Sequence, residues 1–229
     1  MRKVLLGIGV LIIVFIGGTQ IFLPHWADAY AEHFLQAKGA EEAQVRLSST
    51  PAFLLLLGEA NSVEVTARNI AVGPVTLSEA HITGQNVRFD AGTAWSQHEF
   101  QLESATSLTM EGRMNAEAIR NLLQKKVGDL DNLSVEVLPD RIRATATAKA
   151  FGQTLHILLE GMVVEDGKSL YFHVSNLDVQ GASFANSLLE GLVGDVPLVS
   201  LSRFPVPMKV DHVSIENGEV VVTLVRENS

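Results

Sequence analysis

The sequence predicts an α+β fold with a meandering, largely antiparallel sheet and about three short apolar helices, arranged either as an α+β layer or as a curved sheet wrapped around a helix. Most of the chain after Gly58 alternates apolar and polar residues with a period of two, as half-buried strands do. Three turn sequences divide this region into hairpins. Three short segments instead carry apolar residues at helical spacing, and helices this apolar need a sheet face to pack against.

The chain begins with an uncharged apolar run from Val4 to Leu23, directly after Arg2 and Lys3. A helix of about 20 residues extends about 30 Å, the thickness of the hydrocarbon core of a bilayer. The run therefore predicts a transmembrane anchor over residues 1–24. Since the basic flank precedes it, the positive-inside rule leaves the N-terminus in the cytoplasm and the rest of the chain outside.

A cleaved signal peptide is the alternative interpretation of the same run. Ala27-Asp28-Ala29 has the small-x-small spacing of a signal-peptidase site. Against cleavage, the run is longer than the roughly 7–15 residues of an ordinary signal-peptide core. Both interpretations export the chain, so we expect a single-pass cell-membrane protein, or a secreted one if the signal is cleaved.

The acidic charge of the exported part argues against some partners. The chain has 17 Lys and Arg against 26 Asp and Glu, and removing Arg2 and Lys3 leaves 15 against 26, a charge of about −11. Such a surface repels nucleic acid, and it lacks a polybasic stripe for anionic lipid headgroups. The chain has no cysteine, which excludes disulfides, thiol catalysis and Cys-ligated metal sites.

Two segments follow the anchor. Residues 25–44 carry Tyr30, Phe34 and Leu35 at helical spacing and predict a juxtamembrane helix that serves as a stalk. Residues 45–229 predict one extracytoplasmic domain.

This domain begins with a short strand around Val45–Leu47. A buried or lipid-facing helix follows over Pro51–Leu57, with Thr50 as its N-cap and Gly58 at its end.

Two further helices interrupt the strands. Asn115 is a plausible N-cap for a helix over Ala116–Lys126, which places Ile119, Leu122 and Leu123 on one face. Ser183–Gly194 predicts the other helix, with Phe184 and Leu188 among its apolar residues.

The three hairpin turns predict strand pairing. The turn Leu138–Arg141 pairs Val137 with Ile142 and Glu136 with Arg143. The Asp-Gly signal in Glu165–Lys168 puts Leu155, Ile157, Leu159 and Val163 on one face with Leu170, Phe172 and Val174. Asn217-Gly218 joins the final two strands, with Val213 and Ile215 facing Val220, Val222 and Leu224.

The search for catalytic chemistry finds weak candidates. The second hairpin places His173 opposite Glu160, with His156 on the same face, so a hydrolase using these residues is one hypothesis. A solvated cross-strand pair is the simpler interpretation. Asp129-Leu130-Asp131 mimics a metal-binding motif, but it lies in a predicted helix-to-strand loop with no phosphate-binding loop nearby. We therefore expect no catalytic site, no metal and no cofactor.

The apolar composition favours a lipid ligand. Hydrophobic residues make up 47% of the chain and aromatic residues 6%, so a pocket here would be lined by aliphatic side chains. Such a pocket suits an acyl chain, each methylene of which gains about 0.8 kcal/mol on burial. Ordinary core packing is the competing interpretation of these residues.

The stretch from Ser49 to Asp90 resembles the LmeA-like phospholipid-binding family of bacterial envelope proteins. Its matching features are Pro51 opening and Gly58 closing a leucine-rich helix, a V-x-V-x-A-x-N-I strand, the Gly73-Pro74 loop, Leu77, and a strand ending in Val87-Arg88-Phe89-Asp90. Met110–Leu123 and the hairpin Val213–Leu224 also look similar, so the resemblance spans about Val45 to Val225. It implies a non-catalytic phospholipid-binding protein with a fold similar to that of the tubular lipid-binding proteins, in which a strongly curved antiparallel sheet packs around an apolar helix.

We therefore expect a membrane-anchored, extracytoplasmic phospholipid-binding protein that holds an acyl chain in an aliphatic groove between helix and curved sheet. The alternative is a non-catalytic structural or interaction module of the cell envelope. The expected groove lining is Phe53, Leu54, Leu57, Ile119, Leu122, Phe184 and Leu188.

Overall fold

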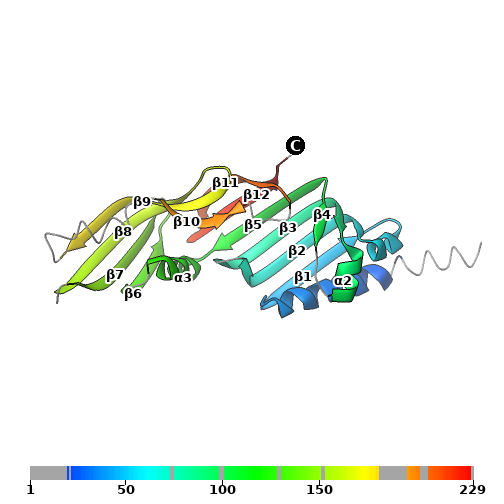
Figure 1. Cartoon of the computed structure of the whole chain (residues 1–229), viewed down its shortest axis with the longest axis horizontal. Coiled ribbons are helices and arrows are strands. Elements are labelled where there is room, and N and C mark those ends of the chain that lie inside the picture. The colour runs from blue at the N-terminus through cyan, green and yellow to red at the C-terminus, as the bar shows by residue number, and fades with distance from the viewer. Residues whose placement is uncertain are drawn as a thin grey trace, which may run out of the picture. The chain divides into compact units, whose positions relative to one another are not determined.

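A computed structural model of the chain describes residues 20, 22–72, 75–97, 101–127, 130–150, 153–180, 195–201 and 206–227. The fold is α+β with mostly antiparallel strands and a strongly curled sheet, which confirms the predicted class (Figure 1). The chain divides into two compact units. Unit 1 comprises Met1–Arg68 and His81–Met110, and unit 2 comprises Asn69–Ala80 and Glu111–Ser229.

The predicted transmembrane run lies almost entirely outside the described residues. Among the helices that the structure does describe, none is long and apolar enough to cross a membrane. The anchor over residues 1–24 therefore stays a prediction.

Unit 1 contains one end of a strongly curled sheet. Its strands follow the order β1 (Glu42–Ser48), β2 (Glu59–Val72), β3 (Val75–Phe89) and β5 (Ser107–Met114), and the short β4 (Leu102–Ser104) also pairs with β3. The last three strands of that order continue into unit 2. A short helix, α2 (Ala91–Gln97), follows β3, and the Asp90 carboxylate accepts a hydrogen bond from Thr93 N at its start.

The predicted strand around Val45–Leu47 is the centre of β1. Its residues alternate strictly between exposed and buried, so Ala43, Val45 and Leu47 point into unit 1. This is the period of two that a half-buried strand requires.

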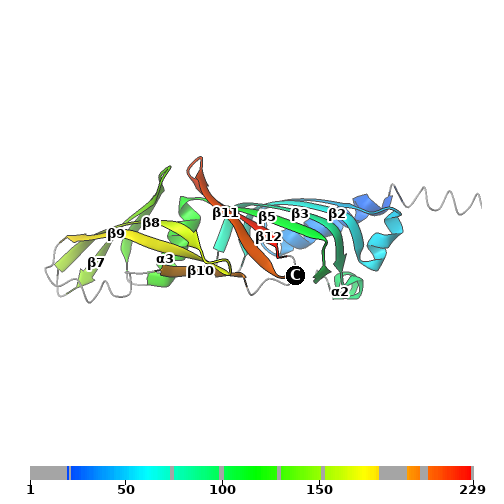
Figure 2. The same ribbon diagram turned by 90° about the horizontal axis from the view of Figure 1, so that it is seen from above.

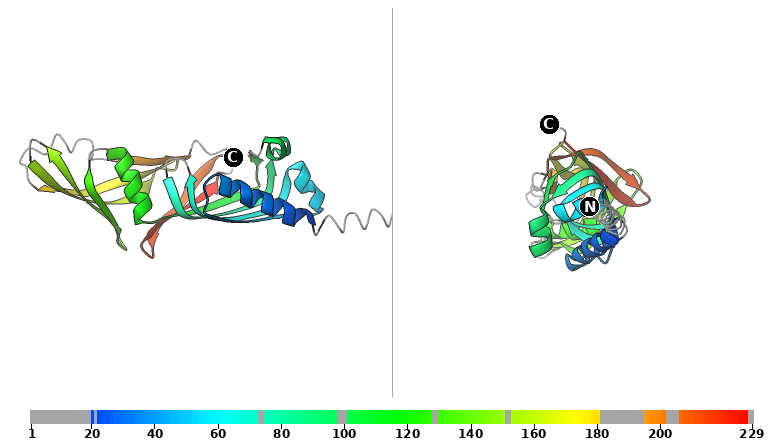
Figure 3. Two further views of the ribbon diagram at one scale, coloured as in Figure 1. Left: turned by 90° about the horizontal axis from the view of Figure 1, so that it is seen from below. Right: turned by 90° about the vertical axis from the view of Figure 1, so that its right-hand side faces the viewer.

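The helix predicted as a stalk packs within unit 1. It spans residues 22–37 and lies along the sheet of unit 1 (Figure 3). Its residues Ala27 and Ala31 are almost completely buried in one core cluster with Val45, Leu47 and Leu55. Small side chains at positions i and i+4 let a helix approach a sheet closely. The helix is therefore a structural part of this unit rather than a free connection.

The leucine-rich helix differs from its prediction. It is a 3₁₀ helix, η1 (Ala52–Leu57), and its N-cap is Pro51, with no hydrogen bond from a capping side chain, so the prediction of Thr50 as N-cap is wrong. Its predicted end is confirmed, because Gly58 adopts the left-handed conformation with φ 79° and its N–H bonds Leu54 O and Leu55 O.

Unit 2 contains the other end of the first sheet, where β5 is followed by β12 (Glu219–Arg226) and β11 (Met208–Glu216). It also contains a second sheet, visible from two directions in Figures 1 and 2. The strand order of this sheet is β10 (Asp195–Ser200), β9 (Ser169–Gln180), β8 (Gln153–Glu165), β7 (Ile142–Ala150) and β6 (Asp131–Val137).

One predicted helix of unit 2 is confirmed and the other is not described. Helix α3 (Ala116–Val127) starts where the sequence predicts, and Asn115 Oδ1 accepts a hydrogen bond of 2.9 Å from Ala118 N. The predicted face of Ile119, Leu122 and Leu123 is buried, with 4%, 2% and 3% of each residue exposed. The segment Ser183–Gly194 lies outside the described residues.

Two of the three predicted hairpin registers are confirmed. Val137 pairs with Ile142 and Glu136 with Arg143, and this register continues as far as Ser134, beyond which the pairing is irregular. In the last hairpin Glu216 pairs with Glu219, and both Asn217 and Gly218 have positive φ, as a type I′ turn requires.

The remaining hairpin is shifted by two residues from its turn to Gly161, and by three beyond a β-bulge between Glu160 and Gly161. Its central residues are Gly167 and Lys168 instead of Asp166 and Gly167, because Asp166 N bonds Ser169 O and the Asp166 carboxylate also accepts bonds from Lys168 N and Ser169 N. A shift of two keeps each side chain on its face. The predicted apolar face is therefore preserved, with Val174 half-buried and the other members buried: Leu155, Ile157, Leu159, Val163, Leu170 and Phe172.

Candidate functional site

Unit 1 has a partly open apolar cavity of about 250 Å³ between the N-terminal helix and the curled sheet. Its wall comes from the helix and from all the strands of this unit. The lining residues are Ala31, Phe34, Leu35, Val45, Leu47, Val63, Val65, Ile82, Val87, Phe89, Leu102 and Leu108. All twelve are apolar, so the wall offers dispersion contacts but no side-chain hydrogen bonds.

Two carboxylates hold the helix over this cavity. Glu32 Oε1 accepts a hydrogen bond of 3.0 Å from Val45 N, and Asp28 Oδ1 accepts one of 2.6 Å from Leu47 N. Both N–H groups belong to β1, the edge strand of its sheet. Edge strands carry unpaired backbone groups, and here the helix satisfies two of them while forming one wall of the cavity.

The Asp28 carboxyl is partly withdrawn from water. Its burial raises its pKa above the ordinary value, and this outweighs the opposite effects of the Leu47 N–H and of nearby His25. The packing of the helix against the strand thus holds the Asp28 carboxylate in place, although its partial burial disfavours the charged form.

The cavity suits part of a hydrocarbon chain. Apolar cavities of about 150 Å³ remain dry and take up benzene, so one of about 250 Å³ has room for a larger hydrocarbon group. Larger ligand sites cover roughly 300–1,000 Å³, and this cavity lies just below that range. Because the wall has no polar side chains, the cavity favours apolar groups that fit its shape and offers no binding partner to a polar headgroup.

The expected groove residues that the structure describes do not line this cavity. Phe53 and Leu57 are exposed, by 40% and 64%, and Leu54 is half-buried in η1. Ile119 and Leu122 are buried in unit 2 on α3. Phe184 and Leu188 lie outside the described residues.

The register shift also separates the residues of the hydrolase hypothesis. Glu160 pairs with Asn176, and His173 pairs with Met162 rather than with Glu160. His173 Nδ1 instead lies 2.7 Å from Asp195 Oδ1, and His156 pairs with Gln180. The predicted pairing of Glu160 with His173 is therefore wrong.

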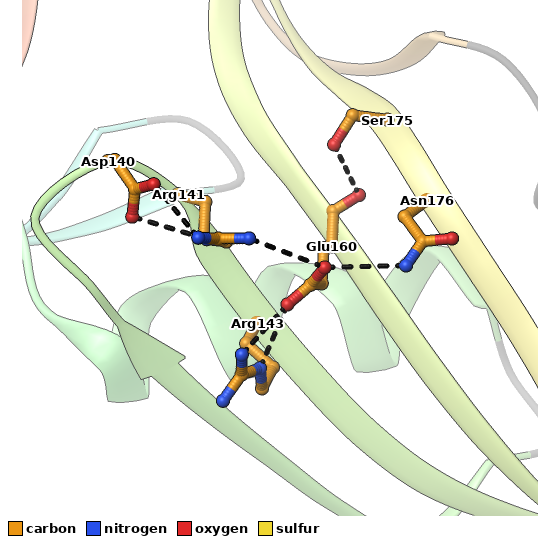
Figure 4. A network of polar contacts seen from close by, with 6 residues as sticks. All are labelled: Asp140, Arg141, Arg143, Glu160, Ser175 and Asn176. Atoms are coloured by element: carbon orange, nitrogen blue, oxygen red, sulfur yellow. Dashed lines mark hydrogen bonds and ion pairs between the residues drawn. The ribbon is translucent and has the colours of Figure 1, made fainter.

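Glu160 is the centre of an arginine network on the second sheet (Figure 4). Its carboxylate lies 2.9 Å from Arg143 and 3.7 Å from Arg141, and it accepts a bond of 3.3 Å from Asn176. The Arg143 hydrogen bond, followed by that of Asn176, lowers the pKa of Glu160. A general acid or base needs a pKa near the working pH, so this environment suits a structural ion pair better than catalysis.

The described residues contain no cluster of three or more His, Asp or Glu side chains that could hold a metal ion. Of the Asp129-Leu130-Asp131 motif, Asp129 lies outside the described part, and Asp131 begins β6, where its backbone oxygen accepts a bond from Thr147 Oγ1.

Sequence reasoning predicted a helix over residues 25–44 but missed that this helix covers the cavity. Its signal was present as two interleaved pairs at helical spacing, Ala27 with Ala31 and Asp28 with Glu32. The small pair allows close approach and the acidic pair reaches the strand edge. The stalk interpretation overlooked both pairs.

Fold and cavity together define a class of protein: an α+β protein in which a helix and a curled sheet line an apolar cavity. Comparison with protein families identifies which one. Residues 21–225 match the LmeA-like phospholipid-binding family, so the chain belongs to that family. The family binds phospholipid and is non-catalytic. No curated protein and no solved structure matches the chain.

Proposed function

We propose that this protein is anchored in the cell membrane, lies outside the cytoplasm, and holds one acyl chain of a phospholipid in the cavity of unit 1. The observation that carries the proposal is the cavity wall, in which all twelve residues are apolar and come from both helix and sheet. Family membership supports phospholipid as the ligand. The uncharged run Val4–Leu23 supports the anchor and the outside location.

The mechanism is exchange of hydrocarbon between two apolar environments. Lifting an acyl chain from a bilayer forfeits about 0.8 kcal/mol for each methylene that becomes wet. Methylenes that enter the cavity are again shielded from water, so the same free energy is recovered for each of them. The headgroup stays in water or at the bilayer surface, because the wall offers it no polar side chain.

A photoactivatable phospholipid tests this proposal on the full chain in native membranes. A diazirine on the acyl chain should cross-link to peptides of β1–β3 as well as to the anchor, whose peptide reports insertion. Val65→Phe places a ring in the cavity, and displacing about two methylenes should lower β1–β3 cross-linking roughly tenfold.

Thr83→Phe is the matched control. Thr83 has nearly the shape of valine, lies on β3 beside the lining residue Ile82, and is exposed. It should leave the cross-linking pattern unchanged. Cross-links confined to the anchor peptide of the unaltered protein would overturn the proposal and favour the alternative, an interaction module with a closed core.

A further inference from the structure

Large apolar side chains are exposed at two places in unit 1. The described residues include six exposed large hydrophobic side chains, and five of them lie either in the first turns of the N-terminal helix or in η1. We call these five the η1 patch. Its members, with their exposed fractions, are Phe22 (76%), Trp26 (51%), Phe53 (40%), Leu56 (42%) and Leu57 (64%).

The two segments of the patch are held together by one side chain. Gln20 Nε2 donates a hydrogen bond of 3.1 Å to Ser49 O, and Gln20 Oε1 accepts one of 2.8 Å from Ala52 N. The start of the blue helix and the η1 turn accordingly lie at the same end of unit 1 (Figures 1 and 3). Gln20 therefore holds the start of the helix beside η1, although the two segments are about 30 residues apart in the sequence.

The geometry of a 3₁₀ helix explains why η1 exposes its apolar residues. With three residues per turn, positions i and i+3 share a face. Ala52 and Leu55 form the inner face, with 0% and 1% exposed. Phe53 and Leu56 consequently share an outer face, and Leu57 extends it just before the turn at Gly58.

We propose that the η1 patch inserts into the outer leaflet of the lipid bilayer, as a second membrane contact beside the anchor. This inference rests on the proposed function, which places an anchor over residues 1–24. Phe22 belongs to the apolar run itself, and Trp26 follows the end of that run by three residues. At about 1.5 Å per residue, Trp26 lies within roughly 5 Å of the point where the run leaves the hydrocarbon.

Charge and residue type support a lipid surface as the occupant. Tryptophan is enriched at the membrane–water interface, where its ring meets both apolar and polar surroundings. The exported part carries a charge of about −11, so attraction to anionic headgroups contributes little. Insertion by apolar area alone is independent of lipid charge and ionic strength.

The segment η1 is also connected to the wall of the cavity. Gly58 O, at the end of η1, accepts a hydrogen bond of 2.9 Å from the N–H of Phe89, and Phe89 lines the cavity. On the other side, Leu47 and Val63 line the cavity within a few residues of η1 on β1 and β2. Insertion of the patch brings the cavity next to the acyl chains it takes up, without a passage through water.

Single-cysteine labelling of the full chain tests the inference, because the chain has no native cysteine. Leu57→Cys carries an environment-sensitive fluorophore, and the protein is reconstituted in neutral phosphatidylcholine vesicles with or without a doxyl-labelled lipid quencher. Gln44→Cys is the control. It is exposed on β1 of the same unit, four residues before the end of that strand.

Insertion predicts strong quenching by doxyl lipid at Leu57→Cys and protection there from aqueous iodide, with the opposite pattern at Gln44→Cys. High salt should change neither result. Equal iodide quenching at the two positions would overturn the inference. A triple change of Phe53, Leu56 and Leu57 to Ser should slow the β1–β3 cross-linking several-fold while the anchor peptide still cross-links.

The two proposals fail in different ways. If the photoactivatable lipid cross-links to β1–β3 but the label at Leu57→Cys is fully exposed to water, the lipid-binding function is supported and the membrane contact is overturned. A buried label without β1–β3 cross-linking keeps the membrane contact and removes the acyl-chain cavity.

Discussion

Asp28 Oδ1 in the N-terminal helix accepts a hydrogen bond of 2.6 Å from the backbone N–H of Leu47 in the edge strand β1. One helical turn later, Glu32 does the same for Val45. Residues i and i+4 of a helix lie about 6 Å apart, and residues i and i+2 of a strand are spaced by nearly the same distance. The two carboxylates on the helix are therefore spaced like the two N–H groups on the strand, and the two hydrogen bonds together hold the helix over the apolar cavity.

Removing the Asp28 carboxylate should loosen this attachment. Asp28→Ala leaves the Leu47 N–H without its acceptor, and a hydrogen bond to a charged group is worth about 1.5–3 kcal/mol. We expect a lower unfolding free energy by about 1–2 kcal/mol, measured by urea denaturation of the full chain in detergent. Glu103→Ala, at an exposed carboxylate of β4, is the control and should change it by less than about 0.5 kcal/mol. Equal effects of the two changes would contradict the role of Asp28.

The pH dependence at Asp28 should have the opposite sign from that of an ordinary paired carboxylate. Burial raises the Asp28 pKa above its ordinary value of 3.8, so the folded state binds this proton more tightly than the unfolded state. Its contribution to stability is fully present below the ordinary pKa and is lost as pH rises through the raised one. Asp28→Asn should therefore gain stability relative to the unaltered protein as pH rises above about 4. A difference in unfolding free energy between Asp28→Asn and the unaltered protein that stays constant with pH would contradict a raised Asp28 pKa.

Gly58 should tolerate no side chain. Its φ of 79° disfavours other residues, and a Cβ there would lie 2.0 Å from Phe89 O, the backbone next to the cavity. Gly58→Ala should lower the unfolding free energy by about 2–3 kcal/mol and lower lipid cross-linking to β3. Gly39→Ala is a matched control, because Gly39 also has positive φ but its Cβ would meet nothing within 4 Å. The control should cost about 1 kcal/mol through backbone strain alone. Similar melting temperatures for the two variants would contradict the clash.

Local signals in the sequence predicted many local features of the fold. Asn115 as N-cap of α3 and the Asn217-Gly218 turn depend on a few adjacent residues, and the structure confirms both. Gly58 as the end of η1 is of the same kind.

Two features were harder to predict. The Asp166 turn has two possible registers that bury the same face, and the Asp166 side chain selects between them by bonding the backbone of Lys168 and Ser169. The candidate site was missed for a different reason, because it depends on a distant partner. Nothing local indicates that Asp28 meets Leu47, 19 residues away, so the helix over the cavity was interpreted as a stalk.

The arginine network around Glu160 should stabilise unit 2 in a pH-dependent way. The Arg143 hydrogen bond lowers the Glu160 pKa below its ordinary value of 4.5, so its stabilising contribution is present above that value and is lost as pH falls through the lowered pKa. Glu160→Gln should therefore be less stable than the unaltered protein at about pH 7, and the difference should shrink below about pH 4.5. Urea denaturation of both proteins across this range measures the difference. Because His173 contacts Asp195 instead of Glu160, His173→Gln should add its own effect independently. A strong non-additive coupling between the two changes would restore the Glu160–His173 pairing that the register of β8 and β9 rules out.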